Sequence, residues 1–335
     1  MNVEYRDLYP EFSVALAALT LRPSQQIVAC LGGGADSQTI LDLLDRWRTE
    51  HPNLSYLAIH LDHRFHPSSA EWAAGLEKDC ARRGFPLRCE VLPVAQGARI
   101  SKEAAGREAR YQRLSELAES DAVMLLGQHR NDQIETFLLQ LKRGAGPKGL
   151  ASMAHAIASD APQRPGQQTW LRPLLGVSKA EIYAYAEYHQ LHWIEDDTNY
   201  DTAIDRNFLR HEVVPKLEQR WPHFGNAVLR SAQLCAEQQD VLDELLAEQL
   251  KQLLNSDGAL AVDPLREHSA ATQRALLRAW LHQNGATMPS YAQLEEIRTQ
   301  MVQSGNDKQP QVGWGRFLLT RTRQRYLQLQ QRHER

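Results

Sequence analysis

The sequence predicts an α/β protein, with a parallel sheet that has helices on both faces, followed by a mostly helical second domain. In the first half, short apolar runs that read as buried strands alternate with stretches of helical periodicity. The spacing of these strands and helices favours a parallel sheet. From about residue 223 the character changes to a long helical pattern rich in Gln and Glu.

The elements follow in order along the chain. Strands are expected at 26–31, 56–61, 87–94 and 122–126, and helices at 37–47, 69–83, 101–118 and from near Asn131. Residues 144–168 are rich in Gly, Ala, Ser and Pro and are expected to form a loop or a weakly ordered insertion. Further helices are expected at 178–190, 205–220 and 223–254, with shorter ones to 303 and a hairpin over 310–330. The expected domains are 1–220 and 221–335.

Composition excludes several classes of protein. The 335 residues include 41 acidic and 38 basic side chains, a net charge of −3, with 42% hydrophobic and 24% charged residues. These values exclude a disordered chain, a collagen-like repeat and a disulfide scaffold, and they argue against a protein that coats nucleic acid. No two of the four cysteines form a C-x-x-C pair, which suits a reducing cytosol and makes a cysteine-bound metal site unexpected. The N-terminus does not read as a secretory signal and the apolar stretch 14–19 is too short to span a bilayer, so a cytoplasmic protein without a membrane partner is expected.

A glycine loop lies between the first strand and the first of these helices. It consists of Gly32, Gly33, Gly34, Ala35, Asp36 and Ser37. Glycines let backbone N–H groups approach an anion, and the N-terminus of the following helix favours negative charge. Asp36 could hold Mg²⁺ on phosphate oxygens, and the Ser37 hydroxyl could donate to phosphate or cap the helix. The alternative is a plain glycine-rich turn with an Asp/Ser cap.

A second cluster, 127–136, follows the fourth strand. Asp132 and Glu135 are three residues apart, so on a helix they share one face at the carboxyl edge of the sheet, where ligands of such sheets bind. Two carboxylates there could hold an ammonium group and help to remove its proton. The alternative is that two acids in a first helical turn only stabilise the helix dipole.

Five ordered blocks carry a resemblance to a known family. The first strand, the glycine loop and the helix after it resemble the pyrophosphate-binding loop of the PP-loop (N-type ATP pyrophosphatase) superfamily, whose fold is Rossmann-like. The second cluster, with 141–150 after it, is similar to the tRNA(Ile)-lysidine synthase family, and so are the segments 103–111, 172–175, 193–199 and 206–210. The resemblance is strong over about 20–235 and weak elsewhere.

The resemblance implies a ligase that forms lysidine in two steps. ATP adenylates the C2 oxygen of the wobble cytidine in a tRNA(Ile) with a CAU anticodon, and the amine of L-lysine then displaces AMP from C2. The cytidine must leave its stack to react, so a pocket for an extruded base is expected.

The resemblance also implies roles for individual residues. Gly32 to Ser37 would hold the ATP triphosphate, with Mg²⁺ on Asp36. Asp132 and Glu135 would grip the lysine amines, and Arg206 would act on lysine or on developing phosphate charge. His60, Asp62 and His63 at the end of the second strand would border the adenosine; a metal site there is disfavoured because no further ligands follow at useful spacing.

Other charged residues are expected to contact nucleotide or tRNA. These are Glu103, Arg107, Arg110, Tyr111, Lys142, Arg143, Lys148 and Arg210, although without the resemblance they would read as solvated helix and loop residues. The arginines of the last twenty residues could form a basic strand face for the tRNA backbone, or only a solvated terminus.

Gly32 departs from the family pattern, which has serine there, and two alternatives follow. One alternative is tRNA 2-thiolation by a PP-loop relative, but the scattered cysteines argue against it. The other is a non-catalytic protein with a degraded loop that binds tRNA or nucleotide. The longer members of the family carry a further C-terminal domain that is not expected here, so the chain is either of a shorter type or truncated. A homodimer is left open.

Overall fold

The computed structural model describes residues 4–62, 64, 66, 68–92, 102–158, 167–195, 200–305 and 309–332, without the side chains of 102–105 and 108. The chain divides into two compact units, Met1–Cys235 and Ala236–Arg335. The boundary expected from the sequence is residue 220, whereas the two units meet within helix α10 (Phe224–Leu253). Among the described residues, no helix is both long and apolar enough to cross a membrane.

The first unit is built on a six-stranded sheet in the order β3-β2-β1-β4-β6-β5. Its strands are β1 (Gln26–Leu31), β2 (Ser55–Asp62), β3 (Leu87–Val91), β4 (Val123–Leu125), β5 (Ala156–Ala158) and β6 (Thr169–Leu171). All pairings are parallel except that of β5 with β6. The predicted fold class is confirmed, but β6 is a strand that the sequence analysis missed, and β5 lies within the segment expected to be a loop.

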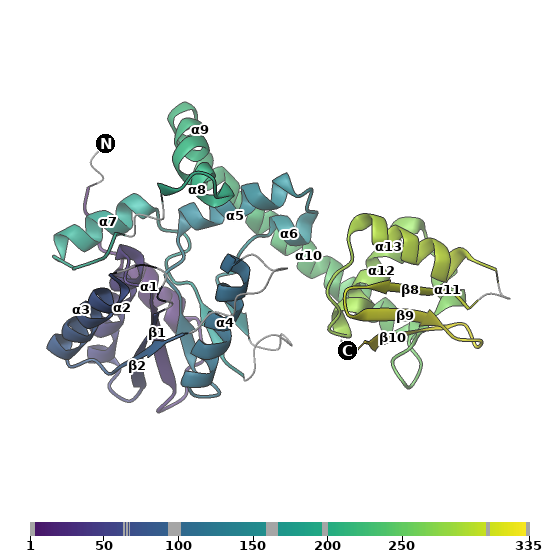
Figure 1. The fold of residues 1–335 in the computed structure, drawn as a ribbon, viewed down its shortest axis with the longest axis horizontal. Coiled ribbons are helices and arrows are strands. Elements are labelled where there is room, and N and C mark those ends of the chain that lie inside the picture. Colours follow the sequence, from purple (N-terminus) through teal and green to yellow (C-terminus); the bar gives the residue numbers. More distant parts are fainter. Residues whose placement is uncertain are drawn as a thin grey trace. The chain divides into compact units, whose positions relative to one another are not determined.

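Strand β1 shows why helices cover both faces of this sheet. Ile27, Ala29 and Leu31 pack into one hydrophobic cluster, and Val28 and Cys30 pack into another. Successive side chains of a strand point to opposite faces, so an unbroken apolar run needs a cover on each side. The helices α1 (Tyr9–Ala17), α2 (Ala35–Glu50), α3 (Ser69–Arg83) and α7 (Lys179–Tyr188) contribute to the first cluster, and α4 (Lys102–Leu117) to the second (Figure 1).

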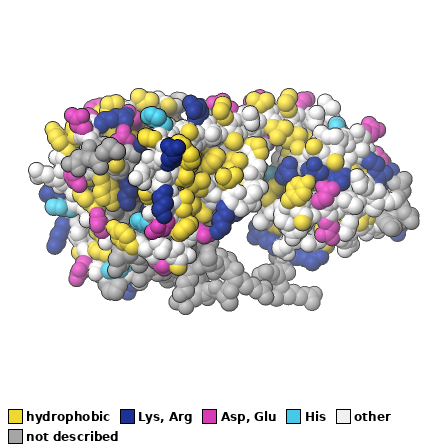
Figure 2. All heavy atoms as spheres, turned by 90° about the horizontal axis from the view of Figure 1, so that it is seen from above, with side chains coloured by type: hydrophobic (Ala, Val, Ile, Leu, Met, Phe, Trp, Pro, Cys, Tyr) yellow, Lys and Arg dark blue, Asp and Glu magenta, His cyan; other side chains and the backbone are white. Residues whose placement is uncertain are grey.

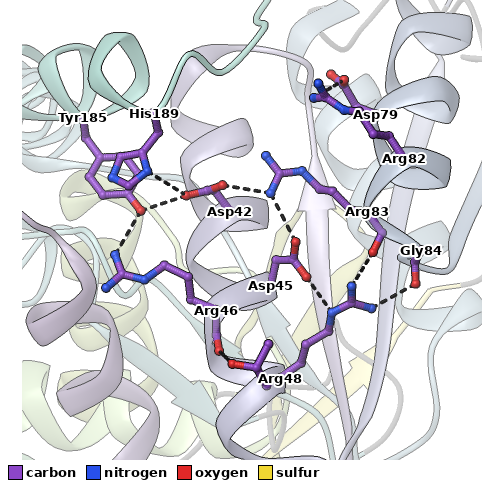
Figure 3. A network of polar contacts seen from close by, with 11 residues as sticks. Asp42, Asp45, Arg46, Arg48, Asp79, Arg82, Arg83, Gly84, Tyr185 and His189 are labelled. Atoms are coloured by element: carbon purple, nitrogen blue, oxygen red, sulfur yellow. Dashed lines mark hydrogen bonds and ion pairs between the residues drawn. The ribbon is translucent and has the colours of Figure 1, made fainter.

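A network of polar contacts links helices α2, α3 and α7 (Figure 3). Asp42 of α2 accepts a hydrogen bond from Arg83 of α3 at 2.8 Å and one from the Tyr185 hydroxyl of α7, also at 2.8 Å. The imidazole of His189 lies 3.9 Å from the same carboxylate. The Asp42 side chain is only 12% exposed, and these hydrogen bonds offset the cost of burying its carboxylate.

The helices that follow β4 surround a small hydrophobic cluster of their own. Ile134 of α5 (Arg130–Lys142) packs there with Val214 and Val228. The helix expected over 205–220 consists of α8 (Asp205–Phe208), a π-helical turn η2 (Leu209–Val213) and α9 (Val214–Arg220). A short helix α6 (Pro147–Leu150) follows α5. This packing brings α8 and η2 against the first turns of α5.

The second unit combines helices with a small antiparallel sheet. The sheet order is β7-β10-β9-β8, and Trp280, Leu319 and Leu327 are among its core residues. Residues 310–330, expected as a hairpin, contain three antiparallel strands of this sheet. The elements are β7 (Leu260–Ala261), α11 (Val262–Arg266), α12 (Ala270–Gln283), α13 (Tyr291–Ile297), η3 (Arg298–Gln303), β8 (Gln311–Trp314), β9 (Phe317–Arg321) and β10 (Tyr326–Gln331).

The expected basic face of the C-terminal strands is only partly available. Arg321 is 3% exposed and donates hydrogen bonds to backbone carbonyls, including that of Met301 at 3.0 Å, so it supports the unit's core. Arg325 is ion-paired with Asp263. Arg316, Arg323 and Arg332 are exposed. Figure 2 shows basic side chains on the visible face of this unit, interleaved with acidic and hydrophobic ones.

Candidate functional site

The glycine loop is held in shape by Ser37. The Ser37 hydroxyl accepts a hydrogen bond from the Gly33 N–H at 3.0 Å and donates one to the Gly34 carbonyl at 2.9 Å. Helix α2 begins at Ala35, with Gly34 as its N-cap, two residues before the expected start. Asp36 therefore lies in the first helical turn, where backbone N–H groups have no partner within the helix. The serine predicted to contact phosphate is engaged here with the loop backbone.

Ile194 covers the loop and was not identified from the sequence. Its N–H donates to the Gly33 carbonyl at 3.0 Å. Gly33 has φ +93°, and a Cβ at this position would lie 2.7 Å from Cδ1 of Ile194. A side chain at residue 33 would therefore meet both backbone strain and a steric clash.

Asp36 is half-buried and lies close to two glycines. A Cβ on Gly34 would lie 2.8 Å from Oδ1 of Asp36, and a Cβ on Gly127, after β4, would lie 3.1 Å from Oδ2. Burial raises the pKa of Asp36; His129 opposes this effect, and the charge of Asp132 adds to it. Ionised Asp36 is thus a high-energy group that a bound cation would stabilise.

Glu135 is the centre of an ion-pair cluster on α5. Arg210 donates from Nε to one carboxylate oxygen at 2.6 Å and from Nη2 to the other at 3.0 Å, and Arg206 donates from Nε at 2.8 Å. Arg210 also reaches Asp132 at 3.3 Å. Glu135 is 1% exposed. The two carboxylates predicted to bind lysine amines therefore already hold arginines.

One cavity, the first of the three described here, lies beside the glycine loop. Its volume is about 350 Å³. Gly32 and Asp36 line it from the loop, and Arg107, Arg110 and Tyr111 line it from α4. The remaining lining residues are Cys30, Ser37, Gly106, Leu114, Leu126, Gly127 and Gln128. Polar loop groups and two arginines thus meet apolar side chains such as Leu114 and Leu126, a combination that suits a nucleotide.

The second cavity is smaller, about 190 Å³, and also includes Asp36. Charged side chains of both signs face it, together with two tyrosines. Its lining residues are Gly34, Ala35, Asp36, His129, Lys179, Ile182, Tyr183, Ile194, Glu195, Tyr200, Arg210 and His211. Among these, Lys179 and Tyr183 belong to no motif used in the sequence analysis, and Ile194 lies in the segment 193–199 but was given no role in the site.

The third cavity, of about 430 Å³, is bordered by three arginines: Arg107, Arg143 and Arg206. It is completed by Thr136, Leu139, Gln140, Met153, Ile204 and Asp205. Arg107 also lines the first cavity, so the first cavity shares one residue with each of the other two.

Several predicted site residues line none of these cavities. His60 contacts the Leu31 carbonyl at 3.1 Å, and Asp62 accepts a hydrogen bond from the Arg64 N–H. Lys142 is ion-paired with Asp205 at 2.7 Å, and Lys148 is exposed on α6. His63 lies outside the described residues, and so does the side chain of Glu103. The roles expected for these residues stay predictions.

Two family models match the chain. A model of the PP-loop domain matches residues 8–217, which is more than half of the chain. A model of the TilS substrate binding domain matches residues 260–327. The first match contains all three cavities.

Curated relatives match over nearly the whole chain. The sequence is 59% identical over 305 residues to a tRNA(Ile)-lysidine synthase of Idiomarina loihiensis, a match that covers 91% of this chain and 67% of that protein. It is 44% identical over 312 residues to the synthase of Serratia proteamaculans, covering 93% of this chain and 70% of the relative. The chain thus spans about two thirds of the length of these relatives.

A solved structure with a related fold is the U34-tRNA thiolase NcsA from Methanococcus maripaludis with its [4Fe-4S] cluster. The TM-score is 0.56 with 16% identity, over 69% of this chain and 78% of that one. This similarity agrees with the parallel sheet, and it is evidence for the fold only. Taken with the two domain matches, the sequence identity to the curated relatives shows that the chain belongs to the tRNA(Ile)-lysidine synthase family.

Proposed function

We propose that this chain uses ATP to join lysine to C2 of the wobble cytidine in a tRNA(Ile) with a CAU anticodon. The observation that carries the proposal is the sharing of residues among the three cavities. Asp36 lines the first and the second, and Arg107 lines the first and the third. A reaction that brings ATP, an amine and a tRNA base together needs three such adjoining spaces.

ATP is assigned to the first cavity. Its triphosphate would lie on the loop at Gly32 to Ser37, where the N-terminus of α2 favours negative charge. The side chains of Arg107 and Arg110 add positive charge to the wall. The half-buried Asp36 carboxylate fits a Mg²⁺ ion, which would neutralise charge on the phosphate oxygens.

Lysine is assigned to the second cavity. At about 190 Å³ it is smaller than the ~300–1,000 Å³ of cavities for drug-sized ligands, a size that suits one amino acid. Glu195 supplies negative charge for an ammonium group, while Tyr183 and Ile194 supply apolar contact. We assign Asp132 and Glu135 to the same step. Both carboxylates accept hydrogen bonds from Arg210. They would contact lysine only if lysine displaced this arginine, and would otherwise act by holding the arginine in place.

The tRNA is assigned to the third cavity. Arg107, Arg143 and Arg206 would bind phosphates on either side of the extruded cytidine, because guanidinium groups match phosphate oxygens in geometry and charge. Gln140 and Thr136 offer hydrogen-bonding groups for a base edge. Arg206 also contacts Glu135, so this cavity adjoins the ion-pair cluster.

The chemical balance of the two steps is simple. The C2 oxygen of cytidine attacks the α-phosphorus of ATP, and pyrophosphate leaves. The lysine amine then attacks C2, the oxygen leaves with AMP, and the amine loses its extra proton. Buried carboxylates near the amine would favour this proton loss.

Two further expectations belong with this proposal. A cytoplasmic location fits a tRNA substrate and the four free cysteines. A homodimer is the other expectation, and sedimentation of the purified chain would decide it.

The proposal is tested by incubating the chain with CAU-anticodon tRNA(Ile), ATP, Mg²⁺ and labelled lysine. We expect label in the tRNA and one AMP released per lysine incorporated. Binding of tRNA without incorporation would support the non-catalytic alternative instead. Uptake of sulfur from a persulfide donor would support thiolation.

A further inference from the structure

Two cations, Lys179 and Arg210, and two carboxylates, Asp36 and Glu195, line the second cavity. Arg210 is already engaged, because its guanidinium holds Glu135 and Asp132. Among the described residues, Lys179 has no ion pair, and its Nζ lies 5.1 Å from the centre of the Tyr183 ring.

The surroundings of Lys179 disfavour the charged form of its side chain. Burial lowers the pKa of Lys179, and the charge of Arg210 lowers it further, while Asp36, Glu135 and Asp132 oppose this effect. The imidazole of His129 also lines this cavity, and its Nε2 atom lies 3.5 Å from Oδ2 of Asp132. His129 is 6% exposed, and its Nδ1 atom is buried without a hydrogen-bond partner in the described part of the chain. An anion placed in this cavity would stabilise the ammonium and could accept a hydrogen bond from this nitrogen.

We propose that Lys179 binds the α-carboxylate of the amino-acid substrate and so makes the site selective for an amino acid over a simple diamine. This rests on the proposed function, since it assumes that the second cavity receives lysine. An ammonium group could be held by Glu195 alone, and this acid would accept lysine and 1,5-diaminopentane equally well. Selection of the carboxylate needs a cation, and Lys179 is the lining cation that the described ion pairs leave available.

A phosphate is the other anion that Lys179 could bind, but the shape of the cavity favours the amino acid. Ile182, Tyr183 and Ile194 line it, and these side chains suit a methylene chain rather than a phosphate group. The backbone also holds Lys179 at the cavity. Its N–H, at the first position of α7, donates to Asn131 at 2.9 Å, and the Ser178–Glu181 capping box holds that helix end.

The test compares two amines in the tRNA ligation assay, L-lysine and 1,5-diaminopentane, with the wild type and Lys179→Met. The wild type should prefer L-lysine in kcat/KM. The variant should raise the KM for L-lysine by about 10- to 100-fold, the value of one charge-assisted hydrogen bond, and leave the KM for the diamine unchanged. Lys179→Arg should recover most of the preference. Lys216→Met is the matched control, because Lys216 is an exposed lysine of α9 paired with Glu212.

Adenylation without amine, followed as release of pyrophosphate, separates the possible failures. If Lys179→Met raises the KM for ATP in this step and keeps the preference for L-lysine, the cation serves phosphate and the inference is wrong. An equal loss for both amines would also overturn it. If the wild type modifies tRNA with neither amine, the proposed function itself fails.

Discussion

The carboxylate of Glu135 and the guanidinium of Arg210 face each other in a bidentate pair, with distances of 2.6 and 3.0 Å. The two residues are 75 positions apart in the sequence. Bidentate geometry of this kind fixes orientation as well as charge. The pair places Arg210 beside the second cavity. Glu135 also holds Arg206, which lines the third cavity.

Glu135→Gln should weaken both stability and catalysis. Removing one partner of a buried ion pair leaves uncompensated charge, and we expect a loss of about 3 kcal/mol, at the lower end of the usual range, since the arginines are up to a quarter exposed. Displaced arginines should lower kcat/KM by about 100-fold. Urea unfolding and the ligation assay measure the two effects. The control Glu212→Gln, at an exposed pair with Lys216, should stay within about 0.5 kcal/mol. Equal stability and activity in Glu135→Gln would refute the role given to the pair.

Asp36→Asn should abolish catalysis and yet raise the thermal stability of the ligand-free protein. Since the pKa of Asp36 is raised in the folded protein, ionising this group costs free energy of folding. The wild type should therefore lose stability as pH rises from the ordinary Asp pKa, about 3.9, through the raised value. The variant lacks this loss, so its advantage in Tm should grow with pH and then level off. Melting curves between pH 4 and 8, with exposed Asp240→Asn as control, check this; an advantage that shrinks as pH rises would contradict it.

Gly32→Ser should improve the use of ATP. A Cβ at residue 32 would lie 3.7 Å from Nη2 of Arg110, an ordinary contact distance, so a serine fits. Its hydroxyl could add one hydrogen bond to phosphate, stabilising by about 1.5–3 kcal/mol, or about 10- to 150-fold in the KM for ATP. Gly33→Ser is the matched control and should lose activity, because φ there is +93° and Ile194 blocks the side chain. An unchanged or higher KM in Gly32→Ser would show that the missing hydroxyl has no part in binding.

Asp42→Ala should destabilise the first unit without changing its substrate affinities. The network of Asp42, Arg83 and Tyr185 lines none of the three cavities (Figure 3). Losing its central carboxylate should cost about 3 kcal/mol in urea unfolding, with unchanged KM values for ATP, lysine and tRNA. Asp79→Ala removes a pair with Arg82, whose side chain is 62% exposed, and should cost under about 1 kcal/mol. A raised KM for any substrate in Asp42→Ala would link this network to the site.

Local sequence patterns were enough to predict the strands next to the glycine loop. The continuous apolar run of β1 and the abrupt glycines after it define both the strand and the loop. Strand β6 was missed because it has only three residues and follows a segment rich in turn-forming residues, so its main signal is its pairing with β4. Helix α8–η2–α9 was predicted as one helix, since a π-helical turn leaves no distinct mark in the pattern.

The site was predictable where its residues belong to motifs and not where they meet through tertiary packing. Asp36, Arg107 and Arg110 were predicted and do line cavities. Lys179 and Ile194 were missed, because chain segments more than 140 residues from the loop bring them to it. The pairing of Glu135 was hidden for the same reason: two acids one helical turn apart predict a cation, but not which cation.

The most direct test of the central claim is the mass of the wobble nucleoside after reaction. The CAU-anticodon tRNA(Ile) is incubated with the chain, ATP, Mg²⁺ and lysine, then digested to nucleosides and analysed by mass spectrometry. The account predicts a nucleoside heavier than cytidine by one lysine less one water, absent without ATP. Unmodified cytidine alone, or a cytidine in which sulfur has replaced the C2 oxygen, would contradict it.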